Sequence, residues 1–212
     1  MDATNSSAPA ANTRVRFWIA LALAAAMASV YVLVTSALHR PIGTTGPAIG
    51  RRLTYLEIEP LTGDSQGVSL ADLSGHVTVL NYWGTWCGPC QVEFPHIVEF
   101  ATKFAGRDDF RLYAVSCGPG FDPELDNLRE ATERFLAANE ATLPTYADQN
   151  AASRRAMAMA LGQDGIGYPT TLVLDRRGII RGFWSGYGRG QEREMQALIE
   201  ELLNQPATQP AA

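Results

Sequence analysis

The sequence contains few of the residues that bind metal ions. Its 212 residues include three cysteines and three histidines, and two of the cysteines, Cys87 and Cys90, are separated by two residues. A zinc site needs roughly four ligands. Beyond this pair only Cys117 and the histidines remain, and none of them forms a second C-x-x-C or an H-x-x-x-H arrangement. The shortage argues against a zinc site, although a structural disulfide or half of a metal site has the same two-residue spacing.

Basic residues are scarce in most of the chain. Five of the 17 basic residues but only one of the 22 acidic residues lie before residue 53, so the remainder carries a net charge of −9. An acidic domain is a poor candidate for binding nucleic acid. We therefore expect no nucleic-acid partner.

Long uncharged apolar runs are absent, with one exception. Residues 17–38 form a stretch of 22 residues without a charged side chain, preceded by Arg14 and Arg16. A helix of about 20 apolar residues can cross a bilayer, and this length favours a retained transmembrane signal anchor, although Ser36-Ala37 leaves cleavage possible. The remaining segments are expected to be a linker, a folded domain and a disordered tail, at 39–52, 53–204 and 205–212 respectively.

The two close cysteines belong to the sequence WCGPC at residues 86–90. The apolar, β-branched run 77–83 before it predicts a buried strand, and apolar residues at helical spacing after it predict a helix over 88–105. Cys87 would lie at the N-terminus of that helix, where unpaired N–H groups and the helix dipole stabilise a thiolate. The thiolate is the species that attacks disulfides. We therefore predict Cys87 as the nucleophile and Cys90, one turn later, as the resolving cysteine.

Alternating strand and helix patterns predict an α/β sandwich. The expected elements are a hairpin-like region at 53–70, strands at 77–83, 110–117 and 143–146, helices at 88–105, 123–139, 150–161 and 190–203, and a β-hairpin at 170–175 and 179–185. Cys117 would end one of these strands as a free thiol, because unpaired cysteines commonly behave as small buried hydrophobes. A functional third cysteine is the alternative.

With these features the chain resembles the thioredoxin superfamily, and more closely its membrane-anchored TlpA/ResA-like branch, from about residue 53 to residue 203. Three features besides the cysteine motif carry the resemblance: Pro95, where such proteins bend the active-site helix, Tyr168-Pro169-Thr170 before a strand, and the run 70–75. The resemblance implies a thioredoxin-like fold, in which helices flank a central mixed β-sheet. An N-terminal β-hairpin extension and one N-terminal transmembrane helix would be added to it.

The resemblance also implies a substrate-contacting surface beside the cysteines. Tyr168-Pro169-Thr170 matches the cis-proline loop of the superfamily, which faces the cysteine pair. A cis bond at Pro169 would expose the backbone of Tyr168, so that a substrate segment could pair there as an added strand. We expect Tyr168, Thr170 and Trp86 to contact the substrate, while Trp83 suits the core better. An ordinary trans turn is the alternative, because only about 5–6% of X–Pro bonds in folded proteins are cis.

Glu93 is expected to accept a proton during the reaction. Thioredoxin itself has a buried aspartate where this chain has Asn81, and in the resembling branch the glutamate of C-x-x-C-x-x-E-F-P, here Glu93, lies beneath the active site. Residues three apart share a helix face. A partly desolvated carboxylate has a raised pKa and could take the proton from Cys90 when that thiol attacks. Without the resemblance Glu93 would be interpreted as a solvated helix residue.

These observations predict a membrane-tethered thiol-disulfide oxidoreductase that needs no cofactor. Thioredoxin, which has the same Gly-Pro between its cysteines, is strongly reducing at about −270 mV, whereas the oxidant DsbA lies near −120 mV, so we predict a reductase. The resemblance implies exported protein substrates such as apocytochrome c, and a membrane electron donor of the DsbD/CcdA kind. It also implies that the domain lies on the periplasmic side of the inner membrane, with residues 1–16 in the cytoplasm.

Two other functions remain open. A thiol peroxidase of the peroxiredoxin type shares the fold but requires a Pro-x-x-x-Thr-x-x-Cys arrangement, and Thr85 stands two residues before Cys87 without the upstream proline. A copper-binding assembly protein would hold copper(I) through Cys87 and Cys90, since soft thiolates suit that ion. Such relatives usually space their cysteines by three and add a distal histidine, and no histidine follows His96.

Overall fold

A computed structural model describes residues 13–38, 42–63, 66–120 and 124–206. The chain divides into two compact units, residues 1–40 and residues 41–212. The first unit contains one helix, α1 (Thr13–Leu38), which has no proline or glycine inside it and whose described side chains, over 16–31, are exposed. Among the described residues, no helix has a stretch that is both long and apolar enough to cross a membrane. The transmembrane helix expected over 17–38 is thus not found in the described part of the chain.

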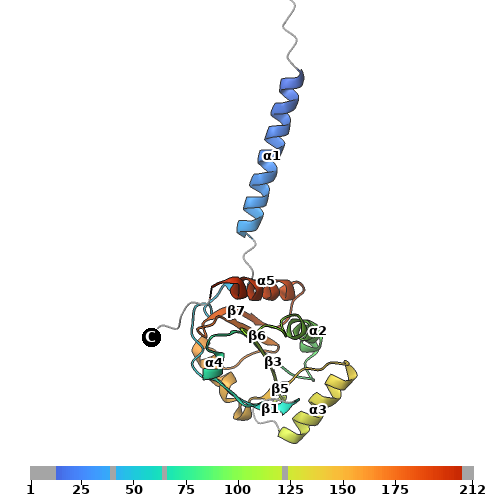
Figure 1. The fold of residues 1–212 in the computed structure, drawn as a ribbon, viewed down its shortest axis with the longest axis vertical. Coiled ribbons are helices and arrows are strands. Elements are labelled where there is room, and N and C mark those ends of the chain that lie inside the picture. Colours follow the sequence, from blue (N-terminus) through green and yellow to red (C-terminus); the bar gives the residue numbers. More distant parts are fainter. Residues whose placement is uncertain (1–12, 39–41, 64–65, 121–123, 207–212) are drawn as a thin grey trace, which may run out of the picture. The chain divides into compact units, whose positions relative to one another are not determined.

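The second unit is built on a seven-stranded mixed sheet with the strand order β2-β1-β5-β4-β3-β6-β7 (Figure 1). The central strand β3 pairs in parallel with β4 and antiparallel with β6, and every one of its residues is buried. The strands are β1 (Glu57–Thr62), β2 (Val68–Ser69), β3 (Val77–Trp83), β4 (Phe110–Ser116), β5 (Thr145–Ala147), β6 (Thr170–Leu174) and β7 (Ile180–Ser185).

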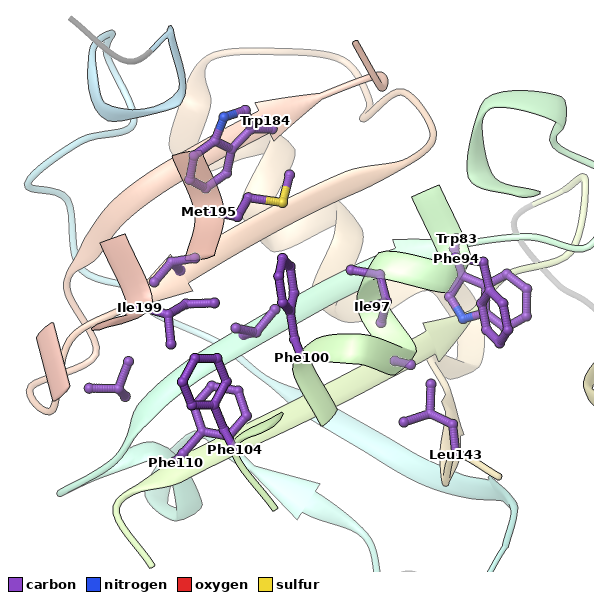
Figure 2. Close-up of a cluster of buried hydrophobic side chains, with 14 of the residues drawn as sticks. Trp83, Phe94, Ile97, Phe100, Phe104, Phe110, Leu143, Trp184, Met195 and Ile199 are labelled. Carbon is purple, nitrogen blue, oxygen red and sulfur yellow. The ribbon is translucent and has the colours of Figure 1, made fainter. Parts of the chain in front are cut away.

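Helices cover both faces of this sheet. They are α2 (Gly88–Lys103), α3 (Leu125–Ala138), α4 (Ala152–Leu161) and α5 (Gln191–Asn204). Figure 2 shows the core of one face, where side chains of α2 such as Ile97 and Phe100 meet Met195 and Ile199 of α5. On the other face, Met157 of α4 packs in a second core with alternate residues of β3. The sheet therefore separates two hydrophobic cores.

The expected α/β order is confirmed, and two boundaries differ for local reasons. Strand β5 begins two residues later than expected because Pro144 has no N–H to give to a strand ladder. Helix α4 begins at Ala152 rather than at 150, because Asn150 and Ala151 have φ angles of 53° and 50° in the left-handed region. The N-terminal hairpin is also confirmed, and its strand β1 extends the sheet by pairing antiparallel with β5.

The described part of the segment expected to be a linker over 39–52 is packed on the domain. The N–H of Gly50 donates to the carbonyl of Ile180, and the N–H of Ile180 donates to Arg51, both at 2.9 Å. A 3₁₀ turn, η1 (Ile42–Thr44), precedes this pairing. A Cβ atom added to Gly43 would lie 1.8 Å from the Trp184 ring, so only glycine fits there. Residues 39–41, and 207–212 of the predicted tail, lie outside the described residues.

Candidate active site

A disulfide joins Cys87 and Cys90 at the N-terminus of α2. Cys87 is the N-cap residue, and its sulfur accepts the backbone N–H of Cys90 at 3.3 Å. Pro89 occupies the first helical turn, where its missing N–H is not needed. The helix therefore directs its free N–H groups at the sulfur of Cys87, as the sequence predicted. A second proline, Pro95, lies inside α2.

The loop before β6 lies beside this pair. The Tyr168–Pro169 peptide bond is cis, as expected. Because Thr170 pairs with Tyr82 of β3, the loop lies next to the end of the strand that leads into the cysteine motif. The ring of Tyr168 packs edge-on against Trp86, with 5.5 Å between ring centroids.

Thr170 contributes to the loop differently from what was predicted. Its side chain is fully buried, and its hydroxyl donates to the carbonyl of Gly167 at 2.8 Å. That hydroxyl therefore braces the loop from inside, and the exposed surface beside the cysteines belongs to Trp86 and Tyr168.

Glu93 is buried beneath α2, with 1% of its surface exposed. Its carboxyl accepts a hydrogen bond from the Asn81 side-chain amide at 2.7 Å and another from the Thr171 hydroxyl at 3.0 Å. Asn81 and Thr171 face each other across β3 and β6, and the same amide also donates to the threonine hydroxyl at 2.8 Å. Burial raises the pKa of Glu93 to about 7, against the opposing effect of the two hydrogen bonds. The carboxyl can therefore change its charge near neutral pH.

The two tryptophans take the places that the sequence predicted. Trp83 is 1% exposed and packs against Phe94 and Phe135. Trp86 is 48% exposed, and its indole N–H donates to the carbonyl of Cys117 at 2.9 Å. A Cβ on Gly84 would lie 2.5 Å from that indole nitrogen, so this glycine allows the ring to fold back over the chain. Sequence reasoning did not single out Gly84.

Cys117 is a free, buried thiol, as expected. Burial raises its pKa to about 12, so it stays protonated near neutral pH. Its sulfur contacts the Val115 carbonyl at 3.5 Å. The thiol is therefore a poor nucleophile where it stands.

A buried ion pair between Asp148 and Arg154 lies behind the loop and was missed by the sequence analysis. One signal could have revealed it. Arg154 lies three and seven residues before the buried residues Met157 and Leu161, so helical periodicity places a charged residue on the buried face of α4. A charge at such a position needs a partner.

The chain offers no cluster of metal ligands in its described part, where no group of three or more histidine, cysteine or acidic side chains is gathered. What the site does offer is a thiol pair that has closed into a disulfide, a helix N-terminus and a buried carboxyl. This combination suits thiol–disulfide exchange.

Comparison with known proteins agrees with this chemistry. Residues 49–183 match the AhpC/TSA family. The chain is 29% identical over 143 residues to the thiol-disulfide oxidoreductase ResA of Geobacillus thermodenitrificans, which covers 67% of this chain and 72% of that protein. It is 26% identical over 195 residues to ResA of Halalkalibacterium halodurans, covering 92% of this chain and 98% of that protein.

A solved structure shows the same fold. A thiol:disulfide interchange protein of the thioredoxin family from Chlorobium tepidum superimposes with a TM-score of 0.57 at 20% identity, over 75% of this chain and 100% of that one. Fold, family match and cysteine site agree with one another. The chain belongs to the AhpC/TSA family and is a thiol-disulfide oxidoreductase with a thioredoxin-like fold.

Proposed function

We propose that this enzyme reduces disulfides in exported proteins. The thiolate of reduced Cys87 attacks one sulfur of a substrate disulfide, forms a mixed disulfide and releases the first substrate thiolate. Cys90 then loses its proton to Glu93 and attacks the sulfur of Cys87. This second step releases the other substrate thiolate and leaves the Cys87–Cys90 disulfide, the state in which the site is found.

The observation that carries this proposal is the buried carboxyl of Glu93, on the same helix as both cysteines. A general base works best when its pKa lies near the working pH. Burial brings the pKa of Glu93 to about 7. The carboxyl lies three residues after Cys90, on the same side of α2, and is held in place by Asn81 and Thr171. It is thus suited to accept the proton that Cys90 must lose.

Substrate contact is assigned to the surface formed by Trp86 and Tyr168. An extended segment of the substrate would pair with the backbone of Tyr168 while its cysteine meets Cys87. Trp86, which is half-exposed, supplies apolar area beside the sulfur. Substrates are accordingly chains with an accessible, flexible segment around the disulfide.

The direction of electron flow is tested by the reduction potential of the Cys87–Cys90 couple. The full-length chain would be equilibrated in dithiothreitol buffers of graded ratio, and its free thiols would be counted after alkylation. A potential well below about −200 mV is expected of a reductase. A potential near −120 mV would identify an oxidase and overturn the proposal.

We further propose that the enzyme is tethered to the inner membrane by residues 17–38, with its thioredoxin-like domain on the periplasmic side. The uncharged length of this stretch, and its position within the continuous helix α1, support the tether. Apocytochrome c before haem attachment is the substrate class that the resemblance suggests, and a DsbD/CcdA-type thiol transporter is the donor. Recovery in the carbonate-insoluble membrane fraction and digestion by protease in intact spheroplasts are expected. Recovery in the soluble fraction would contradict the tether.

A further inference from the structure

Arg154 connects the start of α4 to the loop residue Tyr168. Its side chain is 4% exposed, its Nε donates to the carboxylate of Asp148 at 3.0 Å, and its Nη1 donates to the hydroxyl of Tyr168. The Asp148 carboxylate also accepts the backbone N–H groups of Ser153 at 2.9 Å and of Arg154 at 3.0 Å. Both buried charges are therefore paired and hydrogen-bonded, which a buried ion pair requires.

The backbone is bent sharply to build this arrangement. Asn150 and Ala151, between Asp148 and α4, have φ angles of 53° and 50°. Asparagine tolerates this left-handed conformation, but alanine rarely adopts it because of its Cβ atom. The bend returns the chain so that the first N–H groups of α4 point at Asp148. Strain of this kind persists only where the surrounding structure holds it.

Tyr168 has two further neighbours. The thiol of Cys117 influences the Tyr168 hydroxyl electrostatically, while the Tyr168 ring packs on Trp86. Trp86 in turn donates to the carbonyl of Cys117. Tyr168, Arg154 and Arg155 also line a cleft of about 120 Å³, together with Gly118–Gly120 and Ile166.

We propose that Arg154, oriented by Asp148, is a positioning residue for substrate recognition. It fixes the ring of Tyr168, and through that ring Trp86, so that a protein substrate meets a preformed surface beside the cysteines. The proposal rests on the proposed function, in which these two aromatic side chains contact the substrate. Side chains already fixed before binding do not have to be ordered by it, and this raises affinity without changing the chemical step. Arginine is needed because one guanidinium bonds two partners in different directions, which a lysine ammonium at the same place cannot reproduce.

Two variants remove the same contact from opposite sides. Arg154→Lys keeps the charge beside Asp148 but gives up the bond to Tyr168, and Tyr168→Phe removes the hydroxyl. Arg177→Lys is the matched control, because Arg177 is a half-exposed arginine that follows β6 at the end opposite the Tyr168–Pro169 loop. All would be made in the full-length chain in detergent, with insulin as the protein disulfide, glutathione disulfide as the small one, and dithiothreitol as the reductant.

Arg154→Lys and Tyr168→Phe are each expected to raise KM for insulin by about threefold to tenfold. This is the range expected when one hydrogen bond is lost and the Tyr168 ring is no longer held in place. For Arg154→Lys, the kcat for insulin and the kcat/KM for glutathione disulfide should stay within twofold of the unmodified chain. The double variant should be no worse than either single one, because both delete the same contact. An unchanged KM for insulin in Arg154→Lys, or additive losses in the double variant, would overturn the proposal.

A spectroscopic measurement tests the positioning independently of any substrate. The four tryptophans give four indole N–H signals in an NMR spectrum of the full-length chain, and Trp86→Phe identifies the one from Trp86. Arg154→Lys is expected to move that signal, because the Tyr168 ring lies edge-on to the indole, and Arg177→Lys is expected to leave it in place. A signal unmoved by Arg154→Lys overturns the positioning role. Failure of the unmodified chain to reduce insulin would instead count against the proposed function, and the NMR result would still decide the positioning.

Discussion

Two buried polar networks reach the active site from opposite faces of the sheet, and they differ in how their charge is balanced. Beneath α2, the carboxyl of Glu93 is hydrogen-bonded only by the neutral groups of Asn81 and Thr171. Behind the cis-proline loop, the carboxylate of Asp148 is paired with the guanidinium of Arg154. Both networks occupy similarly dry surroundings, and only one of them contains an opposite charge.

The difference separates two tasks. A buried carboxyl without a cation binds a proton more tightly, because burial disfavours its charged form. Glu93 can therefore gain and lose a proton near pH 7, as a proton acceptor must. A carboxylate paired with arginine instead holds its geometry, because the charged hydrogen bonds between them are directional. The Glu93 network is suited to a change of charge, and the Asp148–Arg154 network is suited to holding side chains in fixed positions.

The largest effect is expected from breaking the ion pair. Asp148→Ala would leave Arg154 buried without a counter-charge, and would remove the acceptor for two N–H groups of α4. The free energy of unfolding should fall by about 3–5 kcal/mol, measured by urea unfolding followed by tryptophan fluorescence. Asp126→Ala removes the exposed partner of Arg129 and should leave that energy nearly unchanged. A loss below about 1 kcal/mol in Asp148→Ala would show that the Asp148–Arg154 pair does not hold this part of the fold through its balanced charge.

The Glu93 network should make stability depend on pH. Because its pKa is raised from the ordinary 4.5 to about 7, the folded protein holds a proton that the unfolded chain has lost between these values. The contribution of Glu93 to the free energy of unfolding is therefore fully present below about pH 4.5. It is lost as the pH rises to about 7, which lowers that free energy by up to about 3 kcal/mol. Unfolding of the oxidised protein at several pH values, compared with Glu93→Gln, isolates this contribution. Parallel curves for the two proteins would contradict it.

Removing the acceptor should slow one chemical step. In Glu93→Gln the carboxamide keeps the shape but takes no proton, so attack by Cys90 should slow by about 100-fold above pH 7, while attack by Cys87 is unchanged. In the unmodified enzyme the rate of that second step should rise as the pH passes about 7, and in the variant this inflection should disappear. Acid quenching and mass spectrometry of the mixed disulfide give both rates. An unchanged second step would leave Glu93 without its proposed role.

The smallest expected effect is a change in the pKa of Glu93. Thr171→Val removes a hydrogen bond that favours the charged form of Glu93, so the pKa of Glu93 should rise further, by about one unit. The inflection in the second step would then move to higher pH. Thr78→Val is the control, because the buried hydroxyl of Thr78 has no partner among the described residues. Equal inflections in both variants would mean that the Thr171 hydroxyl has no influence on Glu93.

The sequence indicated the first network far better than the second. Strand β3, the start of α2 and the place of the cysteines follow from local patterns: an apolar run, helical spacing and a proline in the first turn. Glu93 stands in the motif itself, although its function was inferred from the resemblance. Residues close together on one helix can be related to each other by spacing alone.

The second network joins parts of the chain that no local pattern connects. Arg154 reaches Tyr168 across 14 residues, and Asp148 meets α4 only because Asn150 and Ala151 both adopt left-handed conformations, which asparagine tolerates but alanine rarely adopts. The packed segment over 42–52 was missed for a similar reason. Its proline and three glycines are typical of linkers, while its binding to β7 depends on Gly43, which fits under the ring of Trp184.

That packed segment also affects where another polypeptide could pair with the edge of the sheet. The edge of a sheet presents free backbone groups to which any extended polypeptide can add. Here residues 50–53 bond to the backbone of residues 178–180 beside β7, and the strand at the opposite edge, β2, is only two residues long. Strand addition by another chain is thus blocked at the start of β7 and has only a short partner at β2. In the proposed function, by contrast, the substrate pairs at the loop beside Cys87, where its disulfide can meet the nucleophile.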